Sequence, residues 1–81
     1  MIISEYDIEI LSASMLLGYT GRIIRYIERN NIRDIKDLIR QCALYLIRSG
    51  DTNYKDFNKS IRNILIIYKS EIELYEKNEY V

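Results

Sequence analysis

The sequence contains no histidine, no proline and no tryptophan, and it has one cysteine and three glycines in 81 residues. Without proline and with so few glycines, the chain lacks the turn residues that a β-sandwich or barrel of this length needs, so a few long helices are favoured. The lone Cys42 cannot form an intrachain disulfide, and without histidine there is no cysteine–histidine ligand set for zinc. A single thiol is typical of a reducing compartment.

Features of enzymes and of membrane proteins are missing as well. Cys42 has no histidine base to activate it, and no phosphate-binding loop or nucleotide-binding fingerprint is present. We therefore expect no enzymatic activity, cofactor, metal or small-molecule substrate. No apolar run approaches the roughly 20 residues of a membrane span. The acids Glu5, Asp7 and Glu9 stand where a signal peptide needs positive charge, so we expect an intracellular, cytoplasmic protein without a membrane partner.

Charge is unevenly distributed along a chain whose formal net charge is zero. Residues 1–17 hold three acids and no bases, residues 18–50 hold seven bases against three acids, and residues 71–81 hold four acids and one lysine. A basic middle between acidic ends can attract a polyanion, or it can favour pairing of the chain with itself. The length allows one small domain, which we expect to span residues 1–81.

The spacing of apolar residues predicts an all-α domain of four helices. The first is expected to begin at Ser4, which forms a capping-box-like pair with Asp7, and to end at Gly18. The second is short, with Thr20 as its cap and Asn30–Asn31 at its end. The residues expected to face the core are Ile8, Ile10, Leu11, Met15 and Leu17 in the first helix, Ile23, Ile24 and Ile27 in the second, and Ile32 after it.

The third helix is expected to run from its cap Asp34 to Gly50. The fourth is expected to be the longest, from a cap at Asp51 or Thr52 to about Asn78, a rod of roughly 39 Å at 1.5 Å per residue. Their inner faces are Ile35, Leu38, Ile39, Cys42 and Leu46 in the third, and Phe57, Ile61, Ile64, Tyr68, Ile72 and Tyr75 in the fourth.

A strand is the alternative for part of the last helix. Residues 63–68 are rich in β-branched and aromatic residues, and 64–68 with 71–75 could form a hairpin, the wing of a winged helix. Lys69-Ser70 is poor chemistry for a hairpin turn, which favours the helix.

One stretch, LLGYTGRIIRYIERN at residues 16–30, has the spacing of a helix–turn–helix. Ser14 is small, Leu17 is apolar, and Gly18 stands where the turn needs a positive φ. This spacing resembles the helix–turn–helix of MerR-type and excisionase-type DNA-binding proteins over residues 8–32. The resemblance implies that Thr20–Asn30 is the recognition helix. The candidate contacts to nucleic acid are Thr20, Arg22, Arg25, Tyr26, Arg29 and Arg33.

The geometry of a helix agrees with this interpretation. At 100° per residue, Arg22, Arg25 and Arg29 fall within about 60° of each other, opposite the apolar face. The guanidinium group of arginine can form two hydrogen bonds with a phosphate or with the edge of guanine. Against DNA binding, any amphipathic helix places polar residues outside, Gly21 lowers helix propensity, and DNA-binding domains usually carry a basic balance.

Apolar residues off the inner faces predict self-association. The third and fourth helices each carry apolar residues on a second face, and a small domain with such helices is expected to form a homodimer or a higher homo-oligomer. The candidate interface residues are Leu44, Ile47, Ile66, Ile67 and Leu74.

Two functions follow from these patterns. The first is a small helix–turn–helix protein that binds duplex DNA as a dimer and regulates transcription. The alternative is a non-enzymatic helical-bundle module for protein–protein interaction, or a homo-oligomer, that binds no nucleic acid. Exposed arginines about 34 Å apart in a dimer would favour DNA. Arginines paired with acids would favour the bundle.

Overall fold

The computed structural model describes residues 3–50 and 54–79, and this part of the chain folds into helices without a strand. The predicted all-α class is therefore confirmed, and residues 63–75 are helical apart from Tyr68, which rules out the hairpin. The described residues form five helices: α1 (Glu5–Leu16), α2 (Thr20–Arg29), α3 (Ile35–Ser49), α4 (Tyr54–Ile67) and α5 (Lys69–Glu79).

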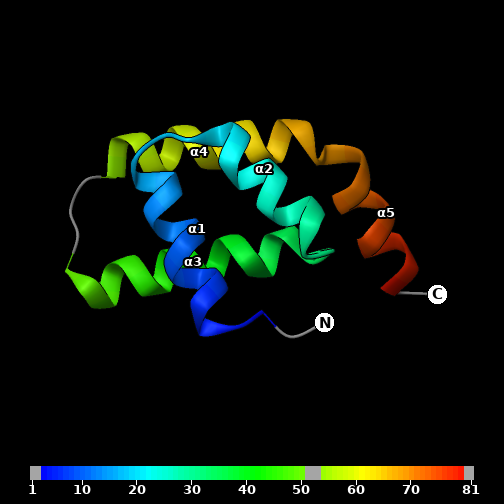
Figure 1. Cartoon of the computed structure of the whole chain (residues 1–81). Coiled ribbons are helices and arrows are strands. Elements are labelled where there is room, and N and C mark those ends of the chain that lie inside the picture. The colour runs from blue at the N-terminus through cyan, green and yellow to red at the C-terminus, as the bar shows by residue number, and fades with distance from the viewer. Residues whose placement is uncertain (1–2, 51–53, 80–81) are drawn as a thin grey trace.

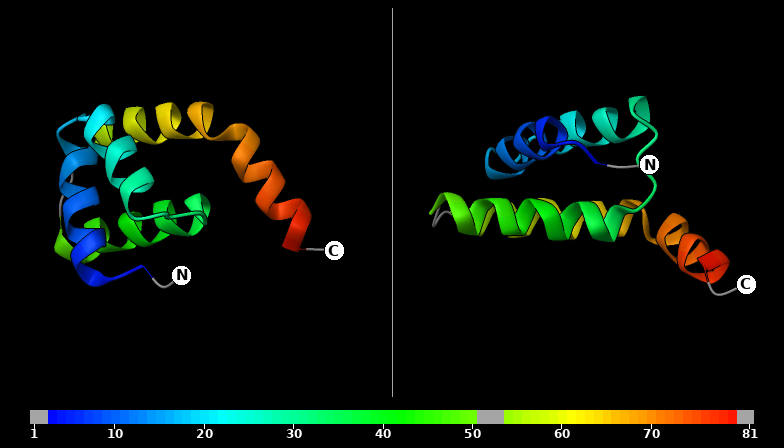
Figure 2. Two further views of the ribbon diagram at one scale, coloured as in Figure 1. Left: turned by 45° about the vertical axis from the view of Figure 1, so that its right-hand side comes forward. Right: turned by 90° about the horizontal axis from the view of Figure 1, so that it is seen from below.

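The first four helices form two layers. Helices α3 and α4 run alongside each other, and α1 and α2 lie across one side of them (Figure 1; Figure 2, right). Helix α1 is the central element because it packs against α2, α3 and α4. Helix α5 leaves the end of α4 at the side of the molecule where α2 is joined to α3 (Figure 1).

The core is built from the apolar faces that the helical spacing predicts. Ile32, the isolated apolar residue between α2 and α3, is 7% exposed and belongs to this core. Leu17 does not, because α1 ends at Leu16 and the chain turns there, which leaves Leu17 60% exposed. The buried apolar residues are Leu11, Met15, Ile23, Ile27, Ile32, Ile35, Leu38, Cys42, Leu46, Phe57, Ile64, Tyr68 and Ile72, with Ile8, Ile24, Ile39 and Ile61 partly buried against them. The side chain of Tyr75 lies outside the described residues.

Most predicted helix ends are confirmed. Ser4 and Asp7 form a reciprocal capping box at the start of α1, the side chain of Asp34 caps α3, and Gly18 and Gly50 both have a φ of 73°. The prediction that Thr20 caps α2 is wrong. Tyr19 occupies the cap position without a side-chain hydrogen bond, and Thr20 is the first helical residue. Asp51 and Thr52, the predicted caps of α4, lie outside the described residues.

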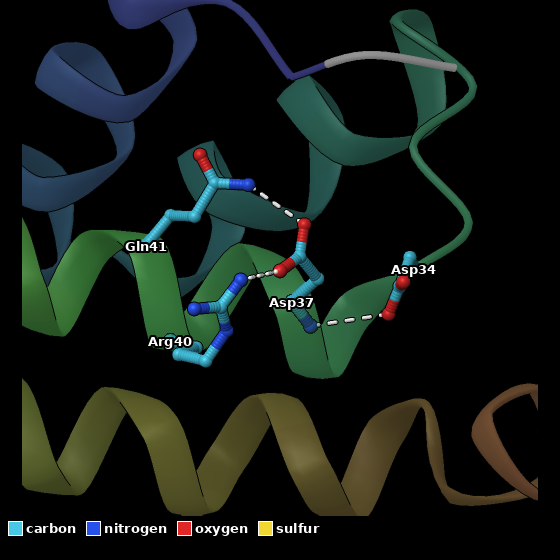
Figure 3. A network of polar contacts seen from close by, with 4 residues as sticks. All are labelled: Asp34, Asp37, Arg40 and Gln41. Atoms are coloured by element: carbon cyan, nitrogen blue, oxygen red, sulfur yellow. Dashed lines mark hydrogen bonds and ion pairs between the residues drawn. The ribbon is translucent and has the colours of Figure 1, made fainter.

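The start of α3 is held by a small polar network (Figure 3). Asp34 Oδ1 accepts from the amide of Asp37 at 3.1 Å, while the carboxylate of Asp37 accepts from Arg40 Nη2 at 2.6 Å and from Gln41 Nε2 at 2.7 Å. The bond from Arg40, and then that from Gln41, lowers the pKa of Asp37 from its ordinary value. The charge of Arg40 is therefore already neutralised within its own helix.

The single long helix predicted after Gly50 is in fact two helices that meet at Tyr68. Helical bonds continue on both sides, from the amide of Tyr68 to the carbonyl of Ile64 and from the amide of Ile72 to the carbonyl of Tyr68. A straight rod would have run past the end of the domain. The bend instead buries Ile72, which is 8% exposed, and lets Glu76 form an ion pair with Lys36 of α3.

Candidate nucleic-acid interface

The α1–α2 pair is joined by a tight turn at Gly18. Gly18 has a φ of 73°, and the amide of Tyr19 donates to the carbonyl of Ser14 at 2.9 Å. A Cβ added at Gly18 would meet no atom within 4 Å, so the positive φ alone explains why glycine suits this position. The turn lets α2 pack back on α1.

Helix α2 has one buried and one solvent-exposed face. Ile23 is fully buried and Ile27 is 2% exposed, whereas Arg22, Arg25 and Arg29 are all exposed. Residues that are three or four positions apart lie on the same side of a helix, so the three arginines form one stripe. We call these three residues the arginine stripe.

The guanidinium groups of the stripe have few partners in the protein. The Arg22 guanidinium lies 5.0 Å from the centre of the Tyr19 ring, and Arg25 Nε donates to the carbonyl of Gly21 at 3.3 Å. Within residues 3–50 and 54–79, no carboxylate forms an ion pair with a stripe arginine, in contrast to the pairing of Arg40 with Asp37. The stripe thus presents three positive charges on one helix face that form no ion pair within these residues.

Two of the predicted contact residues face the protein instead. The hydroxyl of Tyr26 donates to Asp7 Oδ1 of α1, which raises the pKa of Tyr26 to about 12 and lowers that of Asp7. Thr20 Oγ1 accepts from Asn63 Nδ2 of α4 at 3.4 Å. These contacts connect α2 to its two neighbours, so they orient the arginine stripe.

Arg33, the sixth candidate, stands apart from the stripe. It lies two residues after Asn31, which has a φ of 51°, and it lines a groove of about 400 Å³ between the end of α2 and α5. Glu28 and Glu71 line the same groove, so the charged residues that share it with Arg33 are acidic. Tyr68 also lines this groove. Helical spacing could not predict this, because Tyr68 lies some forty residues along the chain from Glu28.

All five predicted interface residues are exposed on the single chain, but they do not form one surface. Leu44 borders a groove between α1 and α3 and lies, with Ile47, in the later part of α3. Ile66 and Ile67 are the last two residues of α4, at its bend with α5, whereas Leu74 lies on α5 and lines the groove that it forms with the end of α2. Their exposed fractions are 38% for Leu44, 62% for Ile47, 73% for Ile66, 52% for Ile67 and 59% for Leu74.

Other kinds of site find no support in the described part of the chain. Its acidic and cysteine side chains nowhere gather in a group of three that could hold a metal ion. Its helices are too short or too polar to cross a bilayer. Cys42 is fully buried, and burial raises the pKa of its thiol, which disfavours the nucleophilic thiolate.

Comparisons with protein-family models, with curated proteins and with solved structures found no match to this chain.

Proposed function

We propose that the protein binds duplex DNA through α2. The observation that carries this proposal is the arginine stripe, whose charges are exposed and unpaired while the opposite face of α2 is buried. A guanidinium fork can bind a phosphate or the edge of guanine through two hydrogen bonds. A helix with such a face fits the major groove when its partner helix packs behind it, as α1 does behind α2.

The contacts around α2 support a fixed presentation of these charges. Tyr26 ties α2 to α1 through Asp7, and Thr20 meets Asn63 of α4. The proposal therefore assigns DNA contact to Arg22, Arg25 and Arg29, and a positioning role to Tyr26 and Thr20. A helix held in a fixed orientation loses less entropy on binding than a mobile one, so the anchoring of α2 contributes to affinity.

Three phosphate contacts support only weak binding by one chain at physiological salt. Two chains related by a two-fold axis would double the contacts, and two α2 helices about 34 Å apart would match successive major grooves. We therefore propose a dimer as the DNA-binding form and transcriptional regulation as its role.

The test is fluorescence anisotropy on an arbitrary duplex of about three helical turns, at low and at physiological salt. We expect binding at low salt that falls steeply as salt rises. The log of the binding constant falls linearly with the log of the salt concentration. A variant with Arg22→Ala, Arg25→Ala and Arg29→Ala should make this dependence shallower by about 2.7 per chain, at about 0.9 per lost phosphate contact.

A charge-matched control is available on α4. Lys55, Lys59 and Arg62 are exposed, and replacing all three by alanine removes the same charge from a different helix. If this control weakens binding as much as the stripe variant, or if the stripe variant binds like the wild type, α2 is not the DNA-binding element.

A helical interaction module without nucleic acid is the second candidate, favoured by the exposed apolar residues near the α4–α5 bend. Absence of duplex binding at low salt, together with self-association, would select it.

A further inference from the structure

A second surface, distinct from the arginine stripe, lies where α5 bends back toward the start of α3. It is a groove of about 430 Å³ whose apolar lining residues are Leu65, Ile66 and Ile72. Ile72 is 8% exposed and lies deep in the groove, whereas Ile66 is 73% exposed and lies at its edge. The same surface therefore offers a hollow and a protruding aliphatic side chain.

The rim of this groove carries charges of both signs. Lys69 and Glu73 lie one turn apart on α5, both are exposed, and neither forms an ion pair within the described residues. Lys36 and Glu76 close the groove between α3 and α5 with their ion pair. We call Leu65, Ile66, Lys69, Ile72 and Glu73 the bend surface.

We propose that the bend surface binds a second copy of this chain about a two-fold axis. Ile66 of each copy enters the groove of the other, and Lys69 of each copy pairs with Glu73 of the other. A two-fold interface must be self-complementary, because the same patch meets itself. The bend surface meets this requirement in shape, with a knob beside a hollow, and in charge, with one free lysine and one free glutamate on the same helix face.

The charge balance argues for a second copy over other occupants. A strongly acidic or basic partner would favour a rim of the opposite sign, whereas Lys69 and Glu73 cancel. Antiparallel α5 helices that face each other through Lys69 and Glu73, and cross midway between these two residues, place residue 69 of one copy opposite residue 73 of the other. Both ion pairs then form at once, around apolar side chains that the single chain leaves in water.

This proposal names the dimer interface that the proposed function leaves open. It does not depend on DNA binding, because no residue of the bend surface belongs to α2. It also divides the predicted interface. Ile66 belongs to the contact, whereas Leu44 and Ile47 lie toward the other end of α3 and remain outside it.

Charge reversal tests the proposal sharply. We expect the wild type to show twice the mass of one chain by light scattering at high micromolar concentration. Lys69→Glu should be monomeric because two acids face two acids, and Glu73→Lys should be monomeric because two bases face two bases. The two variants mixed in equal amounts should dimerise, because each reversed residue then meets an opposite charge. The doubly reversed variant should also dimerise.

Two further variants protect this test against loss of folding. Ile66→Glu should be monomeric alone and in every mixture, while Ile47→Glu, an equally drastic change at an exposed isoleucine of α3, should remain a dimer. Circular dichroism should show wild-type helix content for all variants, since each changed side chain is exposed. A monomeric wild type overturns the proposal. Dimeric single charge variants, or a mixture that stays monomeric, overturn it too, whatever the result of the DNA-binding assay.

Discussion

Replacing Tyr68 by phenylalanine should stabilise the protein. Tyr68 is 4% exposed, and its hydroxyl has no hydrogen-bond partner in the described part of the chain. A buried polar group without a partner costs about 1–3 kcal/mol, and phenylalanine keeps the ring, so no cavity forms. Taking the lower end of that range, we expect a gain of about 1 kcal/mol, which raises Tm by roughly 4–8 °C for a domain of this size.

The matched control is Tyr26→Phe, the same chemical change at a hydroxyl that donates to Asp7. Hydrogen bonds to charged groups contribute about 1.5–3 kcal/mol, so this variant should lose at least about 1 kcal/mol. Urea denaturation of both variants measures the two opposite effects with one method. If Tyr68→Phe destabilises the protein as much as Tyr26→Phe, the Tyr68 hydroxyl has a partner, such as the carboxylate of Glu28 or Glu71 in the adjoining groove.

Further substitutions and a pH titration test other contacts. Gly18→Ala should cost about 1–2 kcal/mol in thermal denaturation because of its positive φ, whereas Gly21→Ala should stabilise α2 by about 0.5–1 kcal/mol, and equal effects would contradict the assigned backbone. Ser60→Ala should cost about 1 kcal/mol, because the Ser60 hydroxyl donates across the core to a carbonyl at the end of α1 at 3.1 Å; an unchanged urea midpoint would show that this bond contributes nothing. The pKa of Asp7 lies below 3.8 in the folded state, so its contribution to stability is present above the unfolded pKa and is lost as pH falls through the folded value. Tyr26→Phe should move the pKa of Asp7 back toward 3.8 in an NMR titration, and an unchanged pKa would exclude Tyr26 as the main cause.

The features that sequence predicts well are local. Ser4, Asp34, Gly18 and Gly50 mark helix ends through chemistry within a few residues, and all four stand where they were expected. Ile32, an isolated apolar residue between two helices, was likewise expected in the core and is buried there. These signals need no knowledge of what the chain packs against.

The features that sequence missed depend on tertiary contacts. No proline or glycine marks the bend at Tyr68 in the sequence. It depends mainly on the burial of Ile72, and it also brings Glu76 to Lys36. Tyr26 looked like a surface neighbour of the arginines, yet it bonds to Asp7, nineteen positions away. The arginine stripe was predictable from helical geometry. That its arginines form no ion pair within the described residues could be seen only in the fold.

The attachment of α5 has a consequence for amide hydrogen exchange. Ile72 is the buried residue among the α5 side chains that the structure describes, and the ion pair of Lys36 with Glu76 is half exposed and so contributes little. Opening of α5 therefore costs much less than global unfolding, and its amides should exchange well before those of α1. Binding of a partner in the neighbouring groove would slow this exchange. The hydrogen-exchange rate of the α5 amides would therefore detect such a partner without chemical labelling of the protein.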